Sequence, residues 1–258
     1  MNSFLFKQLR ENWSNFIIEP GIDRFNIDIN ERFQFLKYFE GSDIAYTIIN
    51  NISFEIEHYS KIFFEVLGLD ENEFKKYRMA TFTEAVPKNQ ASFFTLLPKY
   101  FQEYWQGVDS DIRHDIIRTT AGLSFNHKEK GLIRLILQTY ILEVNSFQAP
   151  TYLFILFHNV TYMMKDDFYW IRFANLDKTG NVLVYHDGFK EVLKDDIISC
   201  REKEILELII DSKSPEEIAD ILFISKNTVN NHRQNMLNRT GVKDTTALID
   251  LCRLCHVI

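Results

Sequence analysis

The sequence predicts two structural classes in one chain: an α+β domain with an antiparallel sheet, followed by an all-α domain of four helices. Two observations lead to this prediction. Segments of strand character flank a helical stretch between Asp43 and Tyr162, and three capped helix starts follow one another between Ser199 and Asp250. The chain has 258 residues, which is enough for two domains that each bury a core.

Residues 1–42 are expected to form a helical extension. Apolar side chains recur at helical spacing over Phe4–Trp13, and Pro20 with Gly21 then breaks the pattern. A second helical pattern covers Asn30–Phe39. Neither segment carries a pattern that is typical of a catalytic site, so we expect both to pack on a neighbouring domain or on a second copy of the chain.

Residues 43–162 are expected to form an antiparallel sheet with helices across one face. Ile44–Ile49 has strand character, Asn50 and Asn51 signal a turn, and Ser53–Glu57 alternates, so this stretch predicts a hairpin. Helical patterns follow at about 59–67 and 89–106, and further strands are predicted over 113–120, 132–144 and 152–161.

This order of two strands, several helices and three strands resembles the PAS fold, and YSKIFFEVLGLDENEF resembles the region where PAS domains place their first helices. The resemblance implies a sensor domain, although a GAF-like sensor stays open. PAS-like sheets often enclose a small ligand between their inner face and their helices. The aromatic candidates for lining such a cavity are Phe63, Phe64, Trp105, Phe154 and Phe157, and the alternative for each is a place in the ordinary core.

Residues 163–194 are expected to connect this domain to the all-α domain over 195–258. Within the connector, Phe168–Ala174 and Val182–Tyr185 flank a turn signal at 177–181 and predict another hairpin. We therefore expect any coupling between the two domains to pass through this segment.

Three helix starts open the C-terminal domain. Ser199 with Glu202 forms a capping box, and so does Ser214 with Glu217, where Pro215 occupies the first helical position. A third helix then begins at a further serine, Ser225, after a short break. A short helix, a tight turn and a second helix are typical of a helix-turn-helix.

One face of the third helix is rich in amides. At 100° per residue, the side chains that fall opposite Val229 are Asn227, Asn230, Asn231, Gln234 and Asn238. Lys226 and Arg233 flank this amide stripe, and Arg239 follows it. Amides pair bidentately with adenine edges and cations suit phosphates, so the face favours DNA recognition. The alternative is a solvated helix face, which would usually carry Glu as well as Lys.

The segment from Ile198 to Arg253 resembles the four-helix DNA-binding domain of the LuxR family. SCREKEIL resembles the opening helix, EEIADILFIS the supporting helix and SKNTVNNHRQNML the recognition helix, while RTGVKDTTAL resembles the start of the fourth helix, which often forms the dimer contact in this family. The resemblance implies that Lys226, Asn227, Asn230 and Asn231 approach the major groove, with Thr228 and Arg233 nearer the DNA backbone. The family usually has Lys where this chain has Asn230, and Lys-Leu in place of Arg239-Thr240. The resemblance therefore does not predict which DNA sequence this chain binds.

The combined prediction is a transcription regulator: a one-component sensor that acts as a homodimer on double-stranded DNA and answers a small-molecule or protein signal. The alternative is a protein-interaction domain that the helix-turn-helix tethers to DNA. The net charge of −7 argues against indiscriminate coating of nucleic acid. The longest apolar run, Tyr152–Phe157, is too short to span a bilayer, and the N-terminus lacks a signal-peptide pattern, so we expect no membrane partner and a cytoplasmic location.

No enzymatic, metal or cofactor role is predicted. The chain has no Walker A motif, no nucleophile elbow and no receiver-type arrangement of acidic residues. Flavin photochemistry needs a reactive Cys in the sensor, and no Cys precedes Cys200. The segment Cys252–His256 matches the haem-attachment pattern C-x-x-C-H, but Leu248, Leu251, Cys252 and Cys255 form an apolar helical stripe, which favours packing.

Overall fold

The structure is a computed structural model that describes residues 7–8, 11, 33–39, 41–107, 118–145, 149–165, 169–174, 184–186, 191–193 and 196–258. Most of the predicted Phe4–Trp13 helix, the turn signal at 177–181 and the first residues of the third predicted strand (113–117) lie outside this part of the chain. None of the helices in these ranges combines the length and the hydropathy that crossing a bilayer requires.

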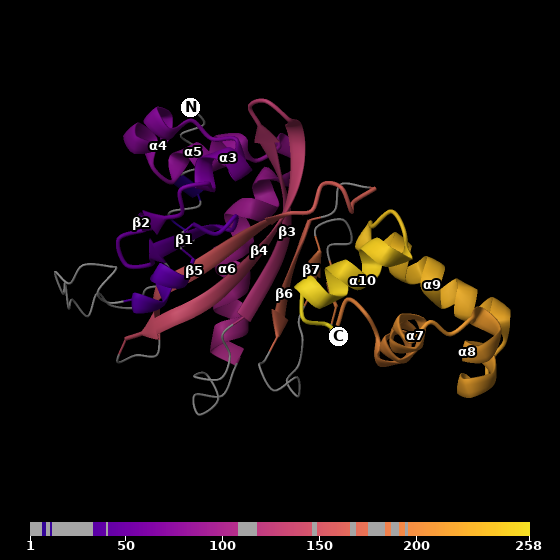
Figure 1. The fold of residues 1–258 in the computed structure, drawn as a ribbon. Coiled ribbons are helices and arrows are strands. Elements are labelled where there is room, and N and C mark those ends of the chain that lie inside the picture. The colour runs from indigo at the N-terminus through magenta and orange to yellow at the C-terminus, as the bar shows by residue number, and fades with distance from the viewer. Residues whose placement is uncertain are drawn as a thin grey trace.

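One antiparallel sheet runs through the centre of the molecule (Figure 1). Its strands are β1 (Ala45–Asn50), β2 (Glu55–Tyr59), β3 (Arg118–His127), β4 (Gly131–Val144), β5 (Pro150–Asn159), β6 (Trp170–Ala174), β7 (Val184–His186) and β8 (Glu191–Leu193). Their order across the sheet is β2-β1-β5-β4-β3-β6-β7-β8. The β1–β2 hairpin and the three strands β3–β5 confirm the predicted PAS-like arrangement, and β6 pairs antiparallel with β7 as the second hairpin prediction requires.

Helices cover one face of the sheet, which we call the inner face. They are α3 (Phe63–Leu67), α4 (Glu71–Tyr77), α5 (Ala80–Ala85), the 3-10 turn η2 (Lys88–Gln90) and α6 (Ala91–Gly107). Gly68 ends α3 in the left-handed conformation, and the Asp70 carboxylate accepts hydrogen bonds from the first amides of α4. The aromatic-rich core of the PAS-like domain lies between these helices and the sheet.

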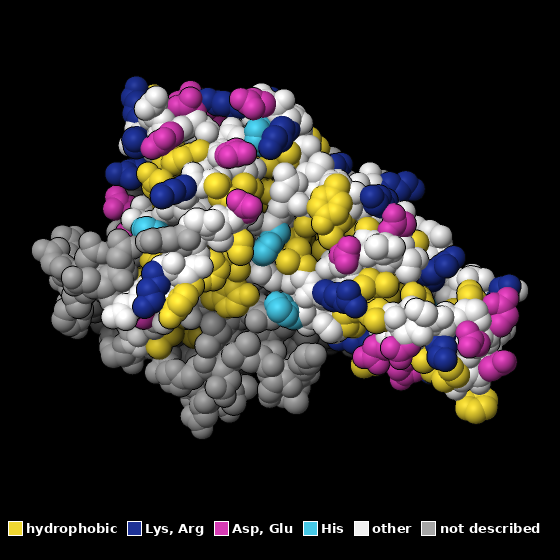
Figure 2. Space-filling model, in the orientation of Figure 1, with side chains coloured by type: hydrophobic (Ala, Val, Ile, Leu, Met, Phe, Trp, Pro, Cys, Tyr) yellow, Lys and Arg dark blue, Asp and Glu magenta, His cyan; other side chains and the backbone are white. Residues whose placement is uncertain are grey.

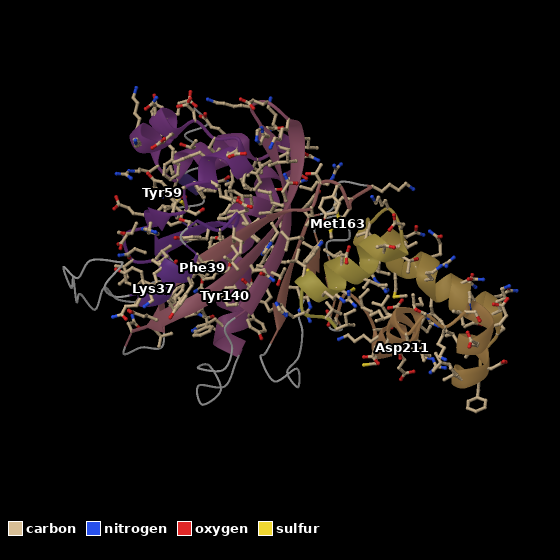
Figure 3. The ribbon with its side chains drawn as sticks, in the orientation of Figure 1. Lys37, Phe39, Tyr59, Tyr140, Met163 and Asp211 are labelled. Carbon is tan, nitrogen blue, oxygen red and sulfur yellow. The ribbon has the colours of Figure 1, made fainter. Side chains whose placement is uncertain are left out.

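Among the residues that the structure describes, two groups of elements cover the opposite, outer face of the sheet. At one end, the 3-10 turn η1 (Gln34–Tyr38) packs against the strands, where Phe35 meets Phe154 edge-on with ring centroids 5.2 Å apart. Figure 3 shows Phe39 and Tyr140 at this end of the sheet. The C-terminal helices cover the other part of the outer face.

Four helices form the C-terminal domain: α7 (Cys200–Ile210), α8 (Pro215–Leu222), α9 (Lys226–Thr240) and α10 (Thr245–Leu254). Figure 1 shows α10 against the sheet, with α7, α8 and α9 extending away from it. The buried residues of these helices form one hydrophobic cluster with Ile136 and Trp170 of the sheet. The helical domain and the sheet therefore share a core.

Candidate nucleic-acid interface and inner-face cavity

Local hydrogen bonds build the helix-turn-helix from α8 and α9. The capping box of Ser214 and Glu217 starts α8, and Phe223 ends it in the left-handed conformation with φ of 55°. Two residues later, the Ser225 hydroxyl accepts a hydrogen bond from the Thr228 amide at 3.0 Å and starts α9. The turn between the helices is therefore fixed by caps at both ends.

The buried side of α9 holds the helix on the domain. Val229, Met236 and Thr240 are buried, and the Thr240 hydroxyl donates to the Met236 carbonyl at 2.7 Å. On the other side, Asn227, Asn231, Gln234 and Asn238 of the amide stripe are exposed and Asn230 is half-buried. The Gln234 amide donates to Asn238 Oδ1 at 2.9 Å, one turn further along the helix. The structure therefore presents the predicted amide stripe as an accessible helix face.

The predicted cations and Thr228 lie in different surroundings. Lys226 is exposed and forms an ion pair with Glu216 of α8 at 2.5 Å, and Arg233 is exposed on α9. Thr228 is half-buried, with its hydroxyl 2.9 Å from that of Ser225. Figure 2 shows basic side chains over α9 and acidic ones gathered over α7 and α8. A DNA phosphate near α9 would compete with Glu216 for Lys226.

Arg239 differs from the other predicted contact residues because it holds α9 against α7. Its Nε donates to the Ile197 carbonyl at 2.8 Å, and its Nη2 forms an ion pair with Glu202, whose side chain is 5% exposed. Burial raises the pKa of Glu202, but hydrogen bonds from Arg239 and Ser199 lower it more, so the net pKa lies below the usual value. Arg239 is therefore placed away from the amide stripe, and it fastens α9 to α7 and to the residues before α7.

The inner face of the sheet encloses a cavity of about 120 Å³. Its floor consists of side chains from β1, β3, β4, β5 and β6, and its roof is formed by α5, α6 and nearby residues. The roof residues from α6 are Phe94, Leu97, Pro98 and Phe101. The cavity lies where a PAS-like domain was expected to enclose a ligand.

Only one of the five aromatic candidates, Phe157, lines this cavity. Phe63 and Phe64 belong to an aromatic cluster with Phe74, and Trp105 stacks on Phe101 with ring centroids 5.9 Å apart. Phe154 lies on the outer face, because it is three residues from Phe157 on one strand and strand side chains alternate. The lining residues that sequence reasoning missed are mostly aliphatic or hydroxylic, and no local pattern distinguishes them from core.

Among the residues that the structure describes, no three His, Cys, Asp or Glu side chains are grouped so that they could hold a metal ion. His127 Nδ1 accepts from two backbone amides at 3.1 Å, and its Nε2 lies 2.9 Å from the Glu65 carbonyl oxygen, so it carries the proton on Nε2. Cys252 and Cys255 are buried in the cluster that the two domains share. These side chains therefore serve packing and hydrogen bonding.

Comparisons with known proteins agree with this geometry. The model of the family "Bacterial regulatory proteins, luxR family" matches residues 196–252. The spore germination protein GerE of Bacillus subtilis (strain 168) is 39% identical over 66 residues, which are 25% of this chain and 89% of GerE. The chain belongs to the LuxR family. Its C-terminal helices are therefore the DNA-binding domain of a transcription regulator.

Other similarities are narrower or weaker. The response regulatory protein YgeK of Escherichia coli (strain K12) is 42% identical over 55 residues, so this LuxR-family chain spans 37% of YgeK. Among solved structures, the LOV protein of Rhodobacter sphaeroides aligns over 100% of this chain and 99% of that chain, with 11% identity and a TM-score of 0.34.

In this LuxR-family protein, a buried ionic network joins the PAS-like sheet to the DNA-binding domain. Arg172 of β6 donates from Nε and Nη2 to the two carboxylate oxygens of Asp196 at 2.7 and 2.9 Å, and from Nη1 to the Cys255 carbonyl at 2.9 Å. Lys203 of α7 also donates to Asp196, at 3.0 Å. Burial raises the pKa of Asp196, but the hydrogen bonds and charges of Arg172 and Lys203 lower it by more. The net pKa therefore lies below the usual value.

A second polar link runs from β5 to the end of α10. Burial lowers the pKa of His158, so its imidazole is neutral near pH 7. His158 Nε2 lies 3.0 Å from Gln138 Oε1, and Gln138 Nε2 donates to the Leu254 carbonyl. The loop after β5 also pairs with the loop after α9, where the Lys243 amide donates to the Met163 carbonyl at 2.9 Å (Figure 3). These bonds fix the orientation of α10 on the sheet.

Proposed function

We propose that this LuxR-family regulator is a one-component sensor in which residues 43–162 control DNA binding by residues 195–258. The observation that carries the proposal is that the cavity and the DNA-binding domain lie on opposite faces of the same strands. On β4, Leu137 lines the cavity, while its neighbours Ile136 and Gln138 contact the helical domain. A change of the cavity wall therefore acts on the support of α10 through a single layer of backbone.

The same arrangement recurs on β6. Ile171 lines the cavity, whereas Trp170 and Arg172 on either side point to the outer face and join the shared cluster and the ionic network. Because cores and interfaces shift between discrete packings, a small displacement in the strands can be passed on as a change of domain orientation. Residues 163–194 thus act in the proposal as part of the sheet that carries the signal.

In the proposed active form, the protein is a cytoplasmic homodimer that places two α9 helices in successive major grooves of double-stranded DNA. Lys226, Asn227, Asn230 and Asn231 approach the major groove, where the asparagines read base edges. Gln234 and Asn238 extend this face, and Thr228 and Arg233 contact the phosphate backbone. Arg239 acts indirectly in this proposal, by holding α9 in place through Glu202.

The test is a selection from a random DNA library with the full chain, followed by titration of variants on the selected site. Asn231→Ala should weaken specific binding by about 1–3 kcal/mol, whereas Arg233→Gln should weaken binding to all sequences and reduce its salt dependence. Asp211→Asn is the control, since Asp211 lies at the end of α7 (Figure 3). Failure to enrich any sequence, or equal losses for Asn231→Ala and Asp211→Asn, would contradict the proposed reading face.

A further inference from the structure

A row of hydroxyl groups crosses the floor of the cavity, whose other lining residues are apolar except for Asn51. Thr47 of β1 and Thr139 of β4 both face Ile155 of β5 in register, and Thr139 in turn faces Thr119 of β3. All four residues line the cavity. Since partners in register sit side by side, the row Thr47-Ile155-Thr139-Thr119 brings three hydroxyls onto one line across four adjacent strands.

These hydroxyls retain hydrogen-bonding capacity that a bound molecule can use. The Thr47 hydroxyl donates to the His58 carbonyl at 2.8 Å, which leaves its oxygen as an acceptor. In the part of the chain that the structure describes, the hydroxyls of Thr119 and Thr139 make no hydrogen bond with another group. A hydroxyl on an apolar wall is costly unless a partner satisfies it, so the floor favours a molecule with a polar group at this row.

The roof opposite this row is formed by apolar side chains. Phe94, Leu97, Pro98 and Phe101 of α6 line the cavity. Pro98 lies inside the helix and has no N–H, so it cannot donate to the Phe94 carbonyl one turn earlier. The roof is therefore apolar and aromatic.

The residues that line the cavity also restrict the charge and the size of a molecule that could bind there. Among the described residues that line the cavity there is no Asp, Glu, Lys, Arg or His, so an ionised ligand would bring an unpaired charge into an apolar site. The volume of about 120 Å³ is near that of an engineered apolar cavity of roughly 150 Å³ that binds benzene. The space fits a single ring with few substituents.

We infer that the cavity binds an uncharged molecule of single-ring size that carries at least one hydroxyl, amide or ring N–H group. The ring packs between Phe94, Phe101 and Phe157, and its polar group bonds to the threonine row. This inference rests on the proposed function, in which the sensor domain receives the signal, and it specifies the chemical class of that signal.

Three probes of similar size test the class with the full chain: phenol, toluene and benzoate. Phenol should raise the melting temperature and give saturable binding in calorimetry. Toluene lacks the polar group and should bind about five-fold more weakly, as expected for the loss of about one net hydrogen bond. Benzoate should not bind, because its carboxylate has no partner. Benzoate binding as tight as that of phenol would overturn the inference.

Two neighbouring threonines on β3 provide matched variants. Thr119→Val removes a hydroxyl from the cavity, whereas Thr120→Val removes one from the outer face, and both side chains are buried. Thr119→Val should weaken phenol binding about five-fold and leave toluene binding unchanged, and Thr120→Val should affect neither. Equal effects of the two substitutions on phenol binding would exclude the threonine row as the recognition element.

Ala121→Leu places a larger side chain in the cavity and should abolish the binding of phenol and toluene. If no probe binds to a chain that still binds its selected DNA, the ligand class is wrong and the DNA-binding assignment stands. If phenol binds as expected but an excess of it leaves DNA affinity unchanged, the cavity site stands and the proposed control of DNA binding by the sensor is contradicted. The two failures are therefore distinguishable.

Discussion

The two faces of the central sheet are built on different physical principles. The inner face is apolar, rich in aromatic rings, and contains a cavity with a few hydroxyls. The outer face, where the DNA-binding domain docks, carries the buried Arg172–Asp196 pair and two donors to the end of α10. Apolar contacts tolerate rearrangement, whereas a satisfied buried polar network specifies one geometry. The inner face therefore tolerates rearrangement of its contacts, whereas the outer face holds the DNA-binding domain in one geometry.

Breaking the ionic network should give the largest effect. Asp196→Ala leaves Arg172, which is 4% exposed, without its carboxylate, and we expect a loss of about 3–5 kcal/mol in the free energy of unfolding. Lys203→Gln removes the half-buried partner of the same carboxylate and should cost less than about 1 kcal/mol. Urea unfolding of both variants measures the difference, and similar losses would show that the Arg172 bonds do not dominate the outer face.

Adjacent residues of β4 separate the two faces. Ile136→Ala and Leu137→Ala should each lower the free energy of unfolding by about 2–5 kcal/mol, because both delete buried aliphatic groups. Only Ile136→Ala removes a contact with the DNA-binding domain, so only this variant should speed hydrogen exchange in α10 beyond the change in global stability. Faster exchange in α10 of both variants would mean that the faces are not independent.

The contact of Gly122 with Trp170 gives a smaller test of the outer face. A Cβ on residue 122 would lie 2.9 Å from Trp170 Nε1, so Gly122→Ala should push the indole toward the helical domain and cost about 1–3 kcal/mol. Tryptophan emission should shift as the ring moves. Gly131→Asn is the control, since no atom lies within 4 Å of its Cβ position and Asn tolerates positive φ.

Low pH should weaken the ion pair of Asp196 on the outer face and that of Glu202 between α7 and α9. The pKa values of Asp196 and Glu202 are lower in the folded chain than in the unfolded one. The stabilisation from each carboxylate is therefore complete above its unfolded pKa and is lost as the pH falls from about 4 through the folded-state pKa. Urea unfolding at pH 7, 5 and 3.5 should show this decline, and Asp196→Asn should flatten it. An identical pH dependence of the wild type and Asp196→Asn would contradict the assignment.

The DNA-binding domain was predictable because its signals are local. The capping boxes at Ser199 and Ser214 and the cap at Ser225 form the hydrogen bonds that their spacing predicts. Each joins groups three residues apart, so a short stretch of sequence contains the whole motif. The strand and helix order of the sensor followed from periodicity for the same reason.

The cavity and the domain contact could not be predicted, because distant residues form them. Thr47 and Thr119 come into line only through the register of four strands, and Arg172 meets Asp196 across a segment that reads as a connector. Strand alternation alone would have placed Phe154 and Phe157 on opposite faces, since they are three residues apart. Sequence alone gave no means of choosing which of those faces bears the helices.

The labelling rate of the buried cysteines Cys252 and Cys255 can report how often the contact between the two domains opens. Burial raises the pKa of the Cys252 thiol to about 12 and that of Cys255 also rises, so almost no thiolate exists while the shared core is closed. Cys200 is exposed and reacts with an alkylating agent without any opening. The alkylation rate of Cys252 and Cys255, divided by that of Cys200, therefore measures how often the shared core opens.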